Sequence, residues 1–561
     1  MLNFTHYSVG YGISHIDELV KRAAELNLPY LTITDLNSLA GCPEFLETVN
    51  KINEKRENKI VPIVGATFTI HLGESFGHIS LLCKNKQGWH NLLNILSTMQ
   101  VDKQEFFELK DVLANLTNLD VVLGDFENRA VLAKILGEKG VSFIETNTQS
   151  NYVRAEDKVL HQVVLSGRLD CTIPEIPQII EKHKEVAKFF GEGTFALTTS
   201  TNLDLSGFAA FSLKAKPFIP NFSLEGRSYS PPEAAELLKN LCRDGWASRK
   251  LNWLCRNDPA LKDVYLNRIK EELKTFEEAN LSSYFLIVKD LMKYSKDNGY
   301  SCGLRGSASG CLIAYLSGIS EIDPVWPDKT IPYDPNKSLL FSRFYNAARN
   351  SGDHISMPDA DIDCCPSFRG AIKQYIVDKY GANKVASYIA TYARYDGKGA
   401  FKQVCRALGT LTPEEVNDIT KFMIDYARIQ DELEDLKQED PKYNTLRYNL
   451  DHVLAVQQLY EEYKEEFDLA VRISDTIYSR SKHAAGVVIS PNNLNENFPI
   501  FVEKDGTKIL GLEMEWAEYV GALKYDLLCV AAYEKIDKII EMINTGSNEP
   551  VVGILEEDIT E

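Results

Sequence analysis

The chain has 561 residues and a formal net charge of −19 at pH 7, and 44% of its residues are hydrophobic. This length predicts roughly two to four domains with cores of their own, and the acidic total predicts weak DNA binding by the chain alone. No apolar run is long enough to span a membrane, the N-terminus lacks the pattern of a secretory signal, and the eleven cysteines include no CxxC pair. We therefore expect a cytoplasmic protein with reduced thiols, with neither a zinc ribbon nor a disulfide framework.

The first part of the chain predicts alternating helices and strands. Ile16–Leu26 has the spacing of an amphipathic helix, and Tyr30–Asp35 and Val61–Ile70 have the composition of strands. This order is typical of βαβ units, which predicts a parallel sheet or a barrel. The stretch Lys214–Tyr229 is rich in residues that break helices and predicts a linker to the next part.

Helices dominate the predicted structure of the middle of the chain. The helices expected before a glycine-rich loop are Pro231–Arg256, Leu261–Glu278 and Tyr284–Ser295. The loop, Gly303–Gly310, precedes a short buried helix, Cys311–Leu316, and residues 370–475 are predicted to be almost entirely helical. Towards residue 561 the pattern predicts two strands and a helix, at Ala485–Ser490, Ala522–Leu528 and Ala532–Ile543.

Carboxylates alternate with apolar residues in Met357–Asp363. Successive side chains of a strand point to opposite faces, so Asp359, Asp361 and Asp363 would share one face. Because like charges side by side weaken a sheet, the pattern is typical of a strand over which cations bind. Two divalent ions held by carboxylates are a standard arrangement for in-line phosphoryl displacement. An exposed, solvated acidic strand is the alternative.

Two further segments predict contacts with phosphate. In Leu523–Leu527, Lys524 and Asp526 would share a strand face, where Asp526 would supply a third metal ligand and Lys524 a positive charge for a phosphate. A salt-bridged edge strand is the alternative. Before Cys311, glycines and the N–H groups of a helix N-terminus would approach a phosphate, and Arg305 would add a planar fork of donors. A tight turn or a helix cap is the alternative there.

These segments, in this order, resemble the family C DNA polymerases, the family of the catalytic subunit of bacterial replicative DNA polymerase III. The resemblance spans nearly the whole chain and rests on seven segments: Ser283–Val288, Gly303–Gly310 with its continuation to Pro324, Leu340–Asn346, Ser356–Asp363, Lys379–Ala386, Lys482–Ile489 and Lys524–Asp526. Seven ordered matches are far more specific than any one of them.

The resemblance implies a role for individual residues. Asp361, Asp363 and Asp526 would be the catalytic carboxylates that hold two Mg²⁺ ions, with Asp359 as a neighbour. A second group would bind the triphosphate of the incoming dNTP: Arg305, Gly306, Ser307, Arg343 and Lys524. Primer–template DNA and dNTPs are the implied substrates, and no protein nucleophile is required.

The first 210 residues resemble the family's PHP domain, a histidine-rich barrel that binds metals in some members. The positions that keep a metal-binding side chain are His6, Asp35 and His78, with His161 as a further candidate. Other positions of the pattern have lost theirs: Ser8, Leu36 and Thr67. Because a metal site needs a full set of ligands, we expect a degenerate scaffold that serves as a docking surface for a proofreading exonuclease.

The fold implied is α/β. A PHP-type (β/α) barrel would occupy residues 1–210, and a palm of the polymerase-β-like nucleotidyltransferase kind would occupy residues 215–385 and 478–561. A helical thumb would be inserted at residues 386–477. Family members continue into fingers, a clamp-binding motif and an OB-fold, which we do not find in this sequence. A short insertion before Ser356 is a further departure from the family's pattern.

The leading functional prediction is therefore a DNA-directed DNA polymerase subunit that needs a second polypeptide for the fingers, with a proofreading exonuclease and a sliding clamp as further partners. One alternative is a non-catalytic protein of replisome assembly. The other is a PHP-type phosphoesterase or 3′–5′ exonuclease, against which the lost ligands argue.

Overall fold

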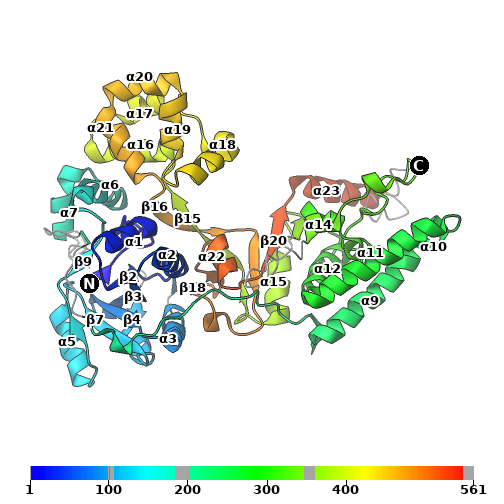
Figure 1. Cartoon of the computed structure of the whole chain (residues 1–561), viewed down its shortest axis with the longest axis horizontal. Coiled ribbons are helices and arrows are strands. Elements are labelled where there is room, and N and C mark those ends of the chain that lie inside the picture. The colour runs from blue at the N-terminus through cyan, green and yellow to red at the C-terminus, as the bar shows by residue number, and fades with distance from the viewer. Residues whose placement is uncertain are drawn as a thin grey trace.

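The computed structural model describes residues 2–98, 100–101, 106–182, 196–197, 203–345 and 360–546. Figure 1 shows an N-terminal α/β region on the left, a helical subdomain above it, and a second α/β region on the right. Within the described ranges, no helix combines the length and the apolar character that crossing a membrane requires.

A six-stranded mixed sheet forms the centre of the N-terminal region. Its strands are β2 (Tyr30–Leu36), β3 (Val61–Leu72), β4 (Ser75–Cys83), β7 (Leu119–Leu123) and β8 (Ile144–Glu145), in this order, with β6 (Phe107–Glu108) beside β3. The predicted strands are confirmed, but only β2–β3, β3–β6 and β7–β8 are parallel. A two-residue turn at Gly73, where φ is +73°, makes β3 and β4 an antiparallel hairpin. No described strand pair closes this sheet, so the barrel stays a prediction.

Helices cover this sheet, and the first of them shows why the sequence pattern was informative. Helix α1 (Ile16–Glu25) buries Ile16, Leu19, Val20 and Ala23, the spacing of one helical face. The other helices of the region are α2 (Cys42–Glu54), α3 (Lys86–Leu96), α4 (Leu109–Leu113), α5 (Arg129–Glu138), α6 (Lys158–Leu169) and α7 (Ile176–Lys182). A short parallel pair, β1 (Leu2–Asn3) and β9 (Gln149–Ser150), joins the start of the chain to the segment before α6.

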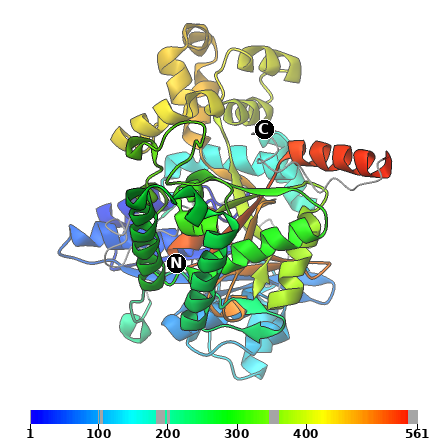
Figure 2. The same cartoon turned by 90° about the vertical axis from the view of Figure 1, so that its right-hand side faces the viewer.

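The second α/β region is built on a five-stranded sheet with the order β12-β13-β20-β17-β14. The strands are β12 (Cys302–Arg305), β13 (Asp361–Cys364), β20 (Lys524–Cys529), β17 (Gly486–Ile489) and β14 (Val385–Ala386). The described helices are α9 (Pro231–Ser248), α10 (Leu251–Leu254), α11 (Pro259–Glu278), α12 (Ser282–Asp297), α13 (Leu312–Leu316), α14 (Phe341–Phe344), α15 (Arg369–Tyr380) and α23 (Ala531–Gly546). Figure 2 shows α23 extending away from the sheet. Asp537, near the middle of α23, accepts a hydrogen bond from the Ser301 amide at 3.1 Å.

The prediction that residues 370–475 are almost entirely helical is wrong at residues 385–394. β14 and β15 (Tyr388–Arg394) occupy this stretch, and their β-branched and aromatic residues pair with strands that come much later in the chain. β15 belongs to a third sheet, whose other strands are β16 (Ile477–His483), β19 (Lys508–Leu510), β18 (Ile500–Glu503) and β5 (Gln100–Val101). The N-terminal region thus supplies an edge strand, β5, to a sheet built by the later part of the chain.

The helical subdomain stands on the β15–β16 pair (Figure 1). Its helices are α16 (Gly397–Leu408), α17 (Pro413–Thr420), α18 (Tyr426–Glu439), α19 (Thr445–His452), α20 (Leu454–Glu462) and α21 (Lys464–Ile473). It shares a hydrophobic core with the N-terminal region, in which Val163 and Val164 of α6 join Phe401 and Val404 of α16. The Gln403 amide also donates to the Val163 carbonyl at 2.8 Å. These contacts fix the subdomain against the N-terminal region.

Candidate active site

The strands β13 and β20 are adjacent and parallel, with Ile362 opposite Leu527 and Asp363 opposite Leu528. Continued by one residue, this register brings Asp361 level with Asp526. Because side chains alternate along each strand, Asp361, Asp363 and Asp526 share one face of the sheet. The other face buries Ile362, Tyr525 and Leu527 in the core with helix α12. Burial of these apolar residues fixes the face on which the carboxylates stand. Asp359 lies outside the described residues.

Two cations contact these carboxylates. Arg305, the last residue of β12, places Nε at 2.7 Å and Nη2 at 2.6 Å from Asp363 Oδ1. The Asp363 carboxylate, and to a smaller extent Asp361, raises the pKa of Arg305. Lys524 Nζ lies 3.1 Å from Asp526 Oδ2 and 3.9 Å from a Glu518 oxygen. Asp526 is buried, and its Oδ1 atom has no hydrogen-bond partner among the described residues.

The metal prediction can be compared with this arrangement. Among the residues that the structure describes, no group of three or more His, Cys, Asp or Glu side chains is placed to hold a metal ion as it stands. Yet the donors fit Mg²⁺ in kind, because Mg²⁺ prefers oxygen ligands, and the buried Asp526 Oδ1 atom without a partner is one that a divalent cation would satisfy. The ion pairs made by Arg305 and Lys524 show which contacts a bound ion would exchange.

The glycine-rich stretch is only partly the loop that the sequence predicted. Gly303–Arg305 belong to β12, and Gly306–Gly310 form a 3₁₀ turn (η4). Gly306 has a φ of +82°, which other residues adopt at a cost, so glycine is needed to turn the chain at the sheet edge beside Asp361. Ser307 follows in the turn. Arg343 lies exposed on α14, which contacts the same turn.

The helix after this turn is not an anion site, and here the prediction is wrong. The carboxylate of buried Glu272 accepts hydrogen bonds from the amides of Leu312 at 3.1 Å and Ile313 at 2.9 Å, so the N-terminus of α13 is already occupied. Arg268 pairs with the same carboxylate at 2.6 Å and donates to the Gly310 carbonyl at 2.8 Å. Glu272 was missed because its position in a long helical pattern resembles that of any solvated glutamate. Its spacing to Arg268 was the available signal.

Hydrogen bonds within the protein engage Asp35, one of the predicted metal-binding side chains of the N-terminal region. Asp35 accepts from the Thr5 amide at 2.7 Å and from the Ser8 hydroxyl at 2.6 Å, and burial raises its pKa to about 6. Thr67 is hydrogen bonded to Ser80 at 2.8 Å. Ser8 and Thr67, which stand at positions where the family's pattern has ligands, thus each make a hydrogen bond within the protein.

The remaining histidines are buried rather than clustered with carboxylates. His6 is buried, neither ring nitrogen has a hydrogen-bond partner among the described residues, and its ring centroid is 4.5 Å from that of His15. Burial, and then the neighbouring His15, lowers the pKa of His6 well below the usual value. His161 Nε2 is 2.8 Å from the Tyr11 carbonyl oxygen. The degenerate scaffold expected from the sequence stays a prediction.

Buried neutral histidines predict acid sensitivity of the N-terminal region. Burial lowers the pKa of His78 to about 3, against 6.5 for an ordinary histidine. The unfolded chain therefore binds more protons, and stability is lost as the pH falls from about 6.5 towards 3. Between pH 7 and pH 5, we expect the free energy of unfolding to fall by roughly 2 kcal/mol less in His78→Gln than in the wild type. Calorimetry at both pH values measures this difference. The raised pKa of Asp35 changes stability with pH in the opposite direction. Because Asp35 is present in both proteins, its contribution cancels in the comparison. An equal loss in both would contradict the assignment.

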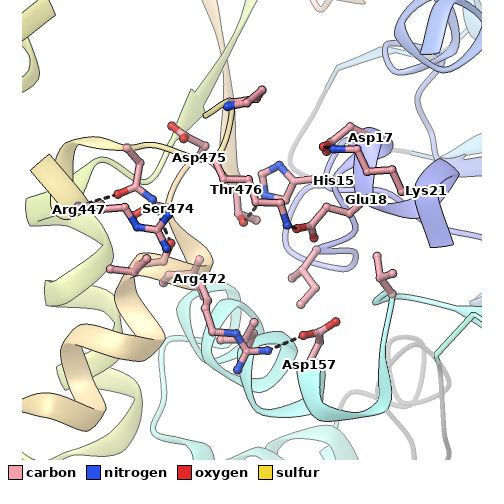
Figure 3. Close-up of a pocket in the computed structure, with 18 residues that line it drawn as sticks. His15, Asp17, Glu18, Lys21, Asp157, Arg447, Arg472, Ser474, Asp475 and Thr476 are labelled. Carbon is pink, nitrogen blue, oxygen red and sulfur yellow. Dashed lines mark hydrogen bonds and ion pairs between the residues drawn. The ribbon is translucent and has the colours of Figure 1, made fainter. Parts of the chain in front are cut away.

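A cavity of about 560 Å³ lies between α1 and the helical subdomain (Figure 3). Ion pairs join its two walls, Lys442 with Glu18 and Arg472 with Asp157. His15 Nε2 is 3.1 Å from Thr476 Oγ1. The described lining of the cavity contains none of the predicted site residues, and the paired charges hold the two regions together.

Comparison with known proteins bears on both regions. The family model of the bacterial DNA polymerase III alpha NTPase domain matches residues 236–529, which include all three carboxylates of the sheet. The PHP domain model matches residues 3–201. The chain is 26% identical to the DNA polymerase III subunit alpha of Ureaplasma parvum over 98% of this chain and 52% of that protein.

The same subunit from two other bacteria gives a similar result. The chain is 26% identical to those of Escherichia coli K12 and Bacillus subtilis, over 98% of this chain and 49% and 50% of those proteins. The chain thus spans about half the length of the curated relatives that it matches. The resemblance read from the sequence motifs is confirmed, and the chain belongs to the bacterial DNA polymerase III alpha family.

Proposed function

We propose that this chain acts as a DNA-directed DNA polymerase subunit, which adds dNTPs to a primer 3′-hydroxyl on a DNA template. The observation that carries the proposal is the alignment of Asp361, Asp363 and Asp526 on one face of adjacent parallel strands, in a chain of the DNA polymerase III alpha family. Apolar residues cover the other face of the same strands, so the carboxylates stand on a rigid support. A cytoplasmic location follows from this function.

Each group at this sheet edge has a part in the proposed reaction. Asp361, Asp363 and Asp526 would hold two Mg²⁺ ions, which when bound lower the pKa of the primer hydroxyl and neutralise charge on the triphosphate. Lys524 offers a point charge, and Arg305 a planar fork, to the phosphate oxygens. We assign Ser307 and Arg343 to the same phosphates, because the 3₁₀ turn and α14 that carry them are in contact.

The turn at Gly306 gives a test of the phosphate assignment. An alanine there would have to adopt a φ of +82°, which shifts the turn and the backbone beside the phosphates. We expect Gly306→Ala to raise KM for dNTP about fivefold to thirtyfold with a small change in kcat, since a backbone strain of about 1–2 kcal/mol weakens dNTP binding. Gly370→Ala is the matched control, because a Cβ there meets nothing within 4 Å. Steady-state kinetics with an unchanged KM would refute the phosphate assignment.

We further propose that full activity needs structure beyond this half of the family's length, as a second polypeptide that supplies the fingers. The N-terminal region, whose metal positions have become a hydrogen-bond network, would dock a proofreading exonuclease, and the assembly would use a sliding clamp. The direct test is primer extension by the purified chain with Mg²⁺ and four dNTPs, with and without the companion polypeptide. Extension that requires both and is lost in Asp361→Ala supports the proposal.

A non-catalytic role in replisome assembly is the second candidate, and one observation favours it. Asp363 and Asp526 are each already paired with a protein cation, as they would be in a site that only supports the fold. This role predicts partner binding that does not change in Asp361→Ala, together with no extension under any combination of polypeptides. A phosphoesterase is disfavoured, because Ser8, Leu36 and Thr67 stand where the family's metal-binding pattern has ligands.

A further inference from the structure

The three carboxylates on one sheet face repel one another, and cations of the protein itself reduce this repulsion. Their mutual repulsion is relieved by Arg305, which contacts Asp363, and by Lys524, which contacts Asp526. Both Arg305 contacts, from Nε and Nη2, go to the same oxygen, Oδ1. Asp363, which is expected to bind a metal ion, is thus bound by the Arg305 guanidinium instead.

The Arg305 contact is the one suited to exchange. Its side chain is 50% exposed, whereas that of Asp363 is only 14% exposed, so the guanidinium lies on the solvent side of the pair. Arg305 is also the last residue of β12, directly before the turn at Gly306 that faces the proposed triphosphate site. Lys524, at 21% exposed, is held between Asp526 and Glu518 and is less able to move.

We propose that Arg305 is a latch on the metal site: it holds Asp363 when no nucleotide is bound, and it exchanges this carboxylate for the phosphates of the incoming dNTP. The inference rests on the proposed polymerase function. A triphosphate carries more negative charge than one carboxylate and matches the guanidinium fork, so the exchange is favourable. Release of Asp363 then adds a ligand for the metal ion, which couples nucleotide binding to metal binding.

The latch predicts effects of opposite sign in one variant. In Arg305→Gln, Asp363 is released permanently, so the affinity for Mn²⁺ without nucleotide should rise about threefold to fivefold, the worth of a partly exposed ion pair. The affinity for a fluorescent dNTP in Ca²⁺ should fall, because the phosphates lose a partner. Electron paramagnetic resonance of free Mn²⁺ measures the first quantity and fluorescence titration the second, both on the full chain. Arg227→Gln, which removes an exposed pair with Glu233, is the matched control and should change neither.

A double-mutant cycle separates the latch from a general charge effect. If Arg305 acts through Asp363, the gain in Mn²⁺ affinity from Arg305→Gln disappears in an Asp363→Asn background. If the gain in Mn²⁺ affinity persists in that background, the latch is overturned, because the gain then comes from long-range electrostatics. An unchanged affinity in Arg305→Gln, with a loss in Asp363→Asn, also overturns it but leaves the metal site standing. If Asp363→Asn leaves Mn²⁺ binding unchanged even with dNTP bound, when the latch has released Asp363 in the wild type, the metal assignment of the proposed function fails instead.

Discussion

Asp361→Asn will reduce nucleotide incorporation by the assembled polymerase at least about a thousandfold, with the fold intact. Asn is nearly the same size but lacks the charge that a divalent cation requires, and electrostatic stabilisation is the main contribution of such a site. Asp361 lies on a strand whose apolar side is fully packed, so the substitution leaves the core unchanged. Single-turnover primer extension measures the loss, and circular dichroism verifies the fold.

The matched control is Asp328→Asn, a carboxylate that accepts hydrogen bonds from Thr330 in an exposed turn. We expect this control to incorporate nucleotides at the wild-type rate. Incorporation by Asp361→Asn within tenfold of the control would remove Asp361 from the metal site. Removal of the divalent cation with EDTA should abolish incorporation in the wild type and the control alike.

Glu272→Ala is expected to have the largest effect on stability. The Glu272 carboxylate is fully buried, and it joins Arg268 to the first amides of α13. Its removal leaves buried N–H groups and a guanidinium without their partner, which costs about 3–5 kcal/mol. Because Arg268 also donates to the Gly310 carbonyl, the turn at Gly306–Gly310 loses its support as well. We therefore expect a lower unfolding temperature and weaker dNTP binding together.

Two variants make this result specific. Glu271→Ala changes the exposed neighbour on the same helix and should shift the unfolding temperature little. Glu272→Gln keeps an acceptor for the α13 amides and should lie between Glu272→Ala and the wild type. Differential scanning calorimetry of all three decides the question, and equal unfolding temperatures for the two alanine variants would show that Glu272 does not cap α13.

The sequence predicted the strand pair with the carboxylates well, and the reason is physical. Alternation of Asp with apolar residues fixes both the strand and the face, as Ile362 in the core shows. Helix α1 was equally readable, because Leu19, Val20 and Ala23 follow the helical period. Periodicity could not predict which strands pair when they lie far apart in the sequence. β15 was taken for helix because its partners, β16 and β19, lie far along the chain.

The ion pairs of the candidate site could not be predicted from the sequence either. Arg305 and Asp363 are 58 positions apart, and only the antiparallel pairing of β12 with β13 brings them together. The same holds for Ser8, whose hydroxyl binds Asp35 where a metal ligand was expected. The incompleteness of the metal positions in the N-terminal region stays a prediction. The hydrogen bonds found at these positions join residues that are far apart in the sequence, so only the folded structure could show them.

The most direct test of the account is to locate the metal. The full chain, incubated with dNTP, would be loaded with Fe²⁺ in place of Mg²⁺, and ascorbate with peroxide would then cleave the backbone near the bound ion, with fragments identified by mass spectrometry. We predict cleavage near Asp361–Asp363, near Lys524–Asp526 and at the turn that contains Gly306, and its loss in Asp363→Asn. Cleavage confined to the neighbourhood of His6 and His78, or cleavage that survives in Asp363→Asn, would contradict the account.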